Sequence, residues 1–166
     1  ISWELMVERM NSDLANILGN LVNRTISMSN KYFDGIVEDK GAAEDVDADL
    51  KAVVTGTYTK VCAKMEDLRV ADAMTEIFSL FKRCNKYIDE TQPWVLAKDE
   101  AKKDRLATVL YNLVESITIG ASLLEPYMPE TSAKIAAQLN TALPSFEECA
   151  VFGHYPCKNK VTDKPE

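Results

Sequence analysis

The sequence predicts an all-α fold, a helical bundle of about five helices followed by an irregular C-terminal tail. Apolar residues recur three and four positions apart over long segments, which is the spacing of amphipathic helices rather than of strands. Glycine and proline are sparse, at six residues each. The 166 residues, 46% of them hydrophobic, suffice for a core. We therefore expect residues 1–166 to form a single domain.

The first helix is expected over residues 1–28, because its central part carries a continuous apolar stripe. The stripe consists of Leu14, Ile17, Leu18, Leu21 and Val22, and Trp3, Leu5 and Met6 extend it toward the start. Residues 34–48 are acidic and aperiodic, and they are expected to form a loop without chemistry of its own. The remaining helices fall within residues 49–139, and we expect them at Asp49–Asp67, Val70–Asp89, Asp99–Leu124 and Glu130–Leu139.

Two further features concern the ends of these segments. Asp47 or Asp49 is available as the N-cap of the second helix. Residues 140–166 show no period, and we expect this tail to pack across the bundle.

The charge balance limits the partners of the chain. A net charge of −7 and a pI near 4.8 exclude a protein that holds nucleic acid mainly by neutralising phosphates. Any role in nucleic-acid binding must rest on a few base contacts, and we expect no DNA partner. We also expect no membrane partner, because no apolar run reads as long enough to cross a bilayer.

The cysteines and the one histidine provide no recognisable catalytic or metal site. No CxxC pair is present, and free thiols fit a reducing, cytoplasmic compartment, with an organellar form left open. Cys149, His154 and Cys157 have mixed spacing and no obvious fourth ligand, so we expect no zinc site there. No catalytic residue is expected, because the chain shows no pairing of a nucleophile with a base.

A ladder of polar side chains flanks the apolar stripe of the first helix. Asn16, Asn20 and Arg24 stand at i, i+4 and i+8, with Asn23 beside them. Asparagine is a poor helix former, so its repetition carries a cost. Amides and a guanidinium can hydrogen-bond to flat polar partners such as bases. The alternative is an ordinary solvated face.

A second informative stretch is CNKYIDETQPWVLAK. Pro93 must end the third helix, which places Trp94 at a corner. A tryptophan there is either a stacking platform for an aromatic partner or a plug in the core between helices. The sequence leaves both open.

Together, these stretches resemble the anticodon-binding helical bundle of the methionyl-tRNA synthetases, which are class I aminoacyl-tRNA synthetases. The similar motifs are DLANILGNLVNR, FDG, NKYIDETQPWVLAK and LEPYMPETSAKIAAQL, in that order along nearly the whole chain. The resemblance implies a bundle that recognises the CAU anticodon of methionine tRNA. Asn16, Asn20, Arg24 and Trp94 match the family's recognition residues, and Asn23, Asn85, Tyr87 and Pro93 are candidates for supporting them.

The resemblance also implies partners outside this chain. In the family, ATP with magnesium and methionine react in a Rossmann-type catalytic domain with HIGH-like and KMSKS-like signatures, and neither signature is present here. We expect this chain to hold no cofactor and to be inactive in aminoacylation by itself, with tRNA and that catalytic domain as its partners. Two alternatives stay open: the bundle of another class I synthetase, and a helical protein-interaction adaptor with Trp94 as an interface anchor.

Overall fold

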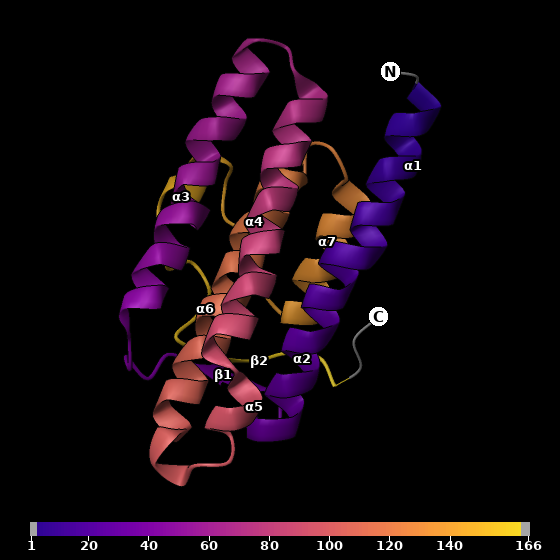
Figure 1. The fold of residues 1–166 in the computed structure, drawn as a ribbon. Helices are drawn as coiled ribbons and strands as arrows, with labels where there is room; N and C mark the ends of the chain where they lie inside the picture. The colour runs from indigo at the N-terminus through magenta and orange to yellow at the C-terminus, as the bar shows by residue number, and fades with distance from the viewer. Residues whose placement is uncertain (1–2, 164–166) are drawn as a thin grey trace.

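A computed structural model describes residues 3–163 and shows a bundle of long helices with one small sheet at its side (Figure 1). The side chains of Trp3 and Met6, expected to extend the first stripe, lie outside the described residues. Leu5, expected beside them, is 61% exposed. The predicted helical bundle is confirmed.

The first helix is one long rod with a wider turn in the middle. It consists of α1 (Trp3–Asp13), a π-helical segment η1 (Leu14–Gly19) and α2 (Asn20–Phe33). The predicted end at residue 28 was too early, because the backbone hydrogen bonds continue to the Ser29 and Asn30 carbonyls, which accept the N–H groups of Gly35 and Asp34. The helix ends at Asp34, whose φ of 54° is left-handed.

The acidic loop predicted at residues 34–48 contains two elements. Strand β1 (Ile36–Glu38) follows α2 directly. Helix α3 (Asp45–Glu66) begins inside the predicted loop, because Glu44 and Asp47 form a reciprocal capping box. The predicted start at Asp49 was therefore too late, and Glu44 is the N-cap rather than Asp47 or Asp49. Helix α4 (Val70–Thr91) then runs antiparallel to α3, as Figure 1 shows.

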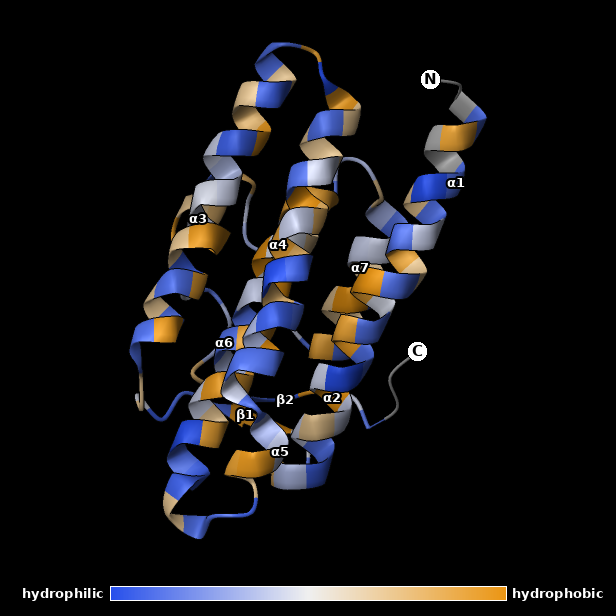
Figure 2. Cartoon of the chain, in the orientation of Figure 1, coloured by the Kyte–Doolittle hydropathy of each residue, from blue (hydrophilic) through white to orange (hydrophobic). Residues whose placement is uncertain are grey.

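The centre of the bundle is α6 (Lys103–Leu124), which follows the short α5 (Pro93–Leu96) and the 3₁₀ turn η2 (Glu100–Lys102). All of its residues from Arg105 to Leu124 are buried. Gly120 is needed there, because a Cβ atom would lie 2.4 Å from the Phe81 ring. Helix α7 (Pro129–Leu139) packs on α6. Figure 2 shows the hydrophilic faces turned outward.

One expectation about apolar length was wrong. The segment Glu100–Leu124 is long and apolar enough to cross a membrane, and its most apolar part is wholly buried inside the bundle. A central helix covered on all sides by other helices has the same composition, and the burial of α6 accounts for its apolar length.

Of the tail predicted at residues 140–166, the part that the structure describes, residues 140–163, packs across the bundle and holds more structure than expected. It contains the 3₁₀ turn η3 (Glu147–Ala150) and strand β2 (Lys158–Lys160), which pairs antiparallel with β1 at Ile36↔Lys160. The buried Glu115 carboxylate accepts backbone N–H groups at positions 153–155. Three-residue strands leave no periodic signal, so the ribbon could not be predicted.

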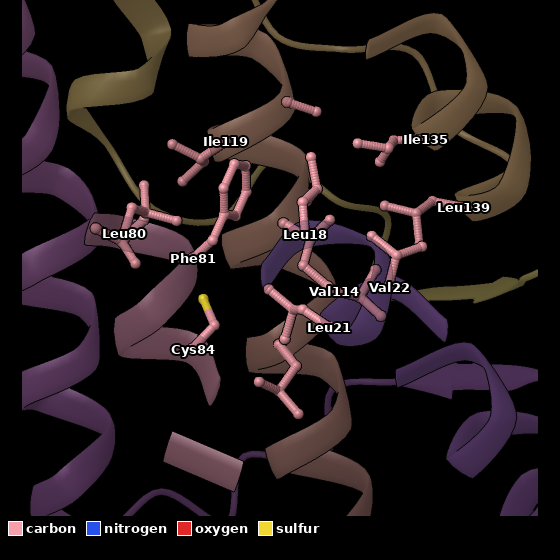
Figure 3. Packing of buried hydrophobic residues seen from close by; sticks show 14 of the residues in the cluster. Leu18, Leu21, Val22, Leu80, Phe81, Cys84, Val114, Ile119, Ile135 and Leu139 are labelled. Atoms are coloured by element: carbon pink, nitrogen blue, oxygen red, sulfur yellow. The ribbon is translucent and has the colours of Figure 1, made fainter. Parts of the chain in front are cut away.

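The core fixes the rotation of the first helix. Leu18, Leu21 and Val22 are almost fully buried, and Leu14 and Ile17 pack against the core from its edge. Figure 3 shows how Leu18, Leu21 and Val22 meet the other helices. Their partners from α4, α6 and α7 include Leu80, Phe81, Cys84, Val114, Ile119, Ile135 and Leu139. The predicted stripe is confirmed, and the opposite face of the helix is turned to solvent.

Candidate nucleic-acid interface

The polar ladder lies on the solvent side of the first helix. Asn16, Asn20, Asn23 and Arg24 are all exposed, while their neighbours Leu21 and Val22 are buried. The buried stripe therefore presents the ladder outward. Exposure leaves the amide and guanidinium groups accessible to a partner.

The π-helical segment η1 coincides with the first part of the ladder. Within it, the backbone N–H of Asn20 bonds to the Ile17 carbonyl, while the Asn20 side-chain amide donates to the Asn16 carbonyl at 2.8 Å. The Asn16 amide donates to the Ser12 hydroxyl at 3.2 Å. Successive rungs of the ladder are thus in direct contact. Isolated π turns inside α-helices occur often at functional sites, and the sequence pattern alone gave no sign of this one.

Asn85 of α4 lies against the same turn. Its side-chain amide donates to the Ile17 carbonyl at 3.4 Å, and the residue is partly buried. Asn85 therefore supports the ladder helix from behind.

Arg24 is held beside α4 by an exposed ion pair. Its guanidinium lies 4.0 Å from the Asp89 carboxylate, and the two side chains are 43% and 73% exposed. Pairs this exposed contribute about 0–1 kcal/mol. The pair therefore orients Arg24 without holding it firmly, and a stronger acceptor can replace Asp89.

Trp94 stands on a tight corner after α4. Gln92 adopts a left-handed φ of 47°, its N–H closes α4 on the Ile88 carbonyl, and the buried Pro93 begins α5. Trp94 is 41% exposed and Val95 is 45% exposed. A tryptophan used only as a core plug would be covered, so this exposure favours the stacking alternative.

The corner lies beside the end of the ladder helix. Leu96 of α5 and Lys31, Tyr32 and Phe33 of α2 line one cavity of 210 Å³, and Figure 1 shows α5 next to the lower end of α2. Moving along α4 and α5, Asn85 meets Ile17, Asp89 meets Arg24, and Leu96 meets the last turn of α2. The ladder helix therefore runs beside α4 and the short α5 that carries Trp94, and we call the surface between them the strip.

Tyr87 does not support this strip. It is fully buried, and its hydroxyl donates to Asp47 at 2.6 Å and accepts from Asn112 at 3.2 Å. Burial raises the pKa of Tyr87 well above its ordinary value. Its position on α4 faces the core rather than the ladder, so Tyr87 is a structural residue of the bundle.

Sequence reasoning missed the buried polar cluster to which Tyr87 belongs. Arg105 forms a bidentate ion pair with Asp47 at 2.6 and 2.9 Å and donates to the Ala42 carbonyl. Burial raises the pKa of Asp47, but the hydrogen bonds from Arg105 and Tyr87 outweigh that effect and leave it below its ordinary value of 3.8. The cluster joins α3, α4 and α6, and its buried, mutually paired groups are not available to act on a ligand.

The group considered for zinc is engaged within the protein. The Cys149 thiol is buried, which raises its pKa to about 11, and it lies near the Ser145 carbonyl. The His154 ring contacts the Glu148 carbonyl at 2.7 Å, and Cys157 is exposed. Within residues 3–163, no three His, Cys, Asp or Glu side chains converge as metal ligands.

The helical-bundle fold defines the class, because it is shared with the methionyl-tRNA synthetases, a family of class I aminoacyl-tRNA synthetases. Residues 37–151 match the family model described as the anticodon binding domain of methionyl tRNA ligase. This match covers more than half of the chain, and the chain belongs to that family.

Similar proteins extend the likeness to the first helix, which precedes the matched range. The methionine–tRNA ligases of Clostridium acetobutylicum and Clostridium tetani are 46% and 47% identical over 96% and 95% of this chain. The methionyl-tRNA synthetase of Mycobacterium tuberculosis bound by methionyl-adenylate superposes with a TM-score of 0.86 at 36% identity over 99% of this chain. The chain spans 25% of the length of those two curated relatives and 33% of the solved chain.

Proposed function

We propose that this chain reads the CAU anticodon of methionine tRNA through the strip between the ladder helix and the Trp94 corner. Asn16, Asn20 and Arg24 hydrogen-bond the bases, and Trp94 stacks on one of them. The observation that carries the proposal is the half-exposed Trp94 on the strip along which Arg24 meets α4. The family membership of the chain supports it.

The chemistry of single-stranded RNA fits this strip. Anticodon bases can be unstacked, placed on an aromatic plane and hydrogen-bonded along their Watson–Crick edges. Each asparagine amide offers donors and an acceptor, and Arg24 adds a fixed fork of donors. Stacking on Trp94 should contribute about 1–3 kcal/mol per base. A cytosine edge can be matched by this set, whereas a uracil in its place leaves groups unpaired.

Because the chain is acidic, we place most of the affinity for the phosphates of the tRNA in other parts of a ligase. Because the chain spans a quarter of its curated relatives, we place the reaction of ATP, with magnesium, and methionine in the remainder of such a protein. In this proposal the bundle selects the tRNA and takes no part in the bond-forming steps.

Titration of Trp94 fluorescence tests the base reading. A Trp3→Phe variant leaves Trp94 as the reporter, and it is titrated with two anticodon stem-loops that carry CAU or UAU. We expect tighter binding of CAU, and loss of that preference in Asn20→Ala and Arg24→Ala. Trp94→Ala should weaken the binding of both loops by about 10- to 100-fold, as measured by the fluorescence anisotropy of labelled RNA. Asn11→Ala, an exposed asparagine on α1, is the matched control and should change neither affinity.

Two outcomes would contradict the proposal. Equal affinity for both loops would leave an RNA-binding bundle without the methionine anticodon preference. No binding of either loop at low salt, by this chain with Trp3→Phe alone and by a full-length relative with an intact ladder, would favour the adaptor alternative.

A further inference from the structure

The π turn η1 overlaps the ladder, and this overlap indicates how the ladder is aligned. We infer that Asn85 is a positioning residue: it holds the π turn, and the π turn keeps Asn16 in line with Asn20 and Arg24. The inference rests on the proposed function, because it concerns the same base-reading strip. It assigns a role to a residue whose observed hydrogen bond goes to the ladder helix rather than to a partner.

The alignment follows from helical geometry. In an α-helix, four residues turn the chain by about 400°, which is about 40° beyond one full turn. In a π turn the hydrogen bonds close over five residues, so four residues fall about 30° short of a full turn. Around the helix axis, the angle from Asn16 to Asn20, which starts inside η1, therefore falls short of a full turn. The angle from Asn20 to Arg24 in α2 exceeds a full turn, so the two deviations have opposite signs. In a regular α-helix the two deviations would add, and Asn16 would rotate away from Arg24.

The hydrogen-bond pattern of a π turn differs from that of the α-helix on either side of it. Two side-chain amides donate to carbonyl groups inside this turn, and one of those carbonyls, that of Ile17, also accepts the backbone N–H of Asn20. Asn20 donates to the Asn16 carbonyl at 2.8 Å, and Asn85 donates to the Ile17 carbonyl at 3.4 Å. The first of these belongs to the ladder itself. Asn85 is the donor that comes from another helix, so it ties the turn to the rigid part of the bundle.

Gly19 suits the same turn. A Cβ atom there would lie 3.3 Å from the Leu14 carbonyl oxygen, which is tighter than an ordinary contact. The glycine that looks out of place in the middle of a helix therefore has a local reason, since it lets the wide turn close on itself. Three features, namely Gly19, the Asn20 amide and the Asn85 amide, thus favour one conformation of one turn.

The first test separates alignment from folding. Asn85→Ala removes the donor, Asn85→Gln keeps it on a longer side chain, and Ser79→Ala on α4 is the control, since that hydroxyl bonds only within its own helix. We expect Asn85→Ala to lower the CAU preference over UAU at least threefold while the melting temperature and the Trp94-dependent affinity change little. Asn85→Gln should restore most of the preference. Amide hydrogen exchange should quicken at residues 18–22 in Asn85→Ala, and amides of α6 should keep their protection.

The second test removes the turn itself. Deleting the exposed Ala15 takes out the extra residue that a π turn contains and returns the segment to α-helix. Asn16→Ala should weaken CAU binding in the parent chain and have no effect in the deletion background, because Asn16 has already left the ladder.

The outcomes distinguish this inference from the proposed function. If Asn20→Ala and Arg24→Ala leave the CAU preference intact, the proposed function fails. If those variants lose it but Asn85→Ala keeps it, with unchanged exchange at residues 18–22, the positioning role is wrong. An additive effect of Asn16→Ala in the deletion background would equally overturn the inference.

Discussion

Two groups of polar side chains lie on the helices of this bundle, and they differ in where their hydrogen bonds go. In the buried cluster, Asp47, Tyr87, Arg105 and Asn112 bond to one another across three helices. In the ladder, the side chains of Asn16 and Asn20 donate to groups of their own helix. Arg24 reaches across to Asp89 at 4.0 Å, near the limit of an ion pair.

This difference distinguishes polar groups that hold the fold together from polar groups that are suited to bind a partner. A buried polar group must be fully paired inside the protein, since an unpaired one costs the folded state. A recognition group must instead keep bonds that a partner can replace. In the proposed function, the same residue types therefore fulfil opposite roles, and solvent exposure together with the origin of their partners tells them apart.

The largest expected effect on stability is that of Arg105→Met in the buried cluster. The substitution leaves the Asp47 carboxylate buried without its ion pair, which should lower the free energy of unfolding by about 3–5 kcal/mol. Urea denaturation measures this change. Arg83→Met is the matched control, because its pair with Glu90 at 2.7 Å is more exposed and should contribute about 1 kcal/mol or less. Equal effects of the two substitutions would show that burial does not distinguish the pairs.

The pH dependence of stability tests the same ion pair between Asp47 and Arg105. The pKa of Asp47 lies below its ordinary 3.8, so its stabilising effect is complete above 3.8 and is lost as pH falls through the lower, folded-state value. In Arg105→Met the buried carboxylate loses that support, its pKa should rise, and protonation should relieve the unpaired charge. We expect the stability gap between the parent and Arg105→Met to narrow as pH is lowered from neutral to below 3.8. A gap that stays constant over this range would contradict the assignment.

The smallest expected effect concerns Asp89→Asn on the recognition side. Losing an exposed pair should change stability by about 1 kcal/mol or less. The substitution also removes a negative charge beside the RNA and releases Arg24, so binding of the stem-loop should tighten by about fivefold at most. The gain should shrink as salt is raised. Glu66→Gln, an exposed carboxylate at the far end of α3, should leave binding unchanged.

The sequence predicted the helices well, because each long helix carries its own apolar spacing. It failed where a structure depends on a distant residue. The burial of Asp47 is set by Arg105, which lies 58 residues away, and the strand at Ile36–Glu38 exists only because Lys158–Lys160 pairs with it. Such pairings leave no local period.

The site shows the same division. The exposed rungs Asn16, Asn20 and Arg24 could be predicted, since exposure follows from the buried stripe beside them. Tyr87 was a candidate for supporting the ladder, and the structure places it in the core, because a position near Trp94 in sequence does not specify which side of α4 a residue faces. The π turn was missed because one extra residue in a helix barely alters the apolar spacing. The base-reading role of these residues stays a prediction until RNA is titrated.

The contacts of the last residues with the ladder helix bear on how the domain forms during synthesis. The Asn30 amide donates to the Thr162 carbonyl, 132 residues later, and Val161 donates to the Gly35 carbonyl. Contacts so distant along the chain form late in folding. A ribosome must therefore release nearly the entire domain before the end of the ladder helix can settle, and a nascent chain that stops short of residue 158 should emerge with helices but without the contacts that hold the end of the ladder helix.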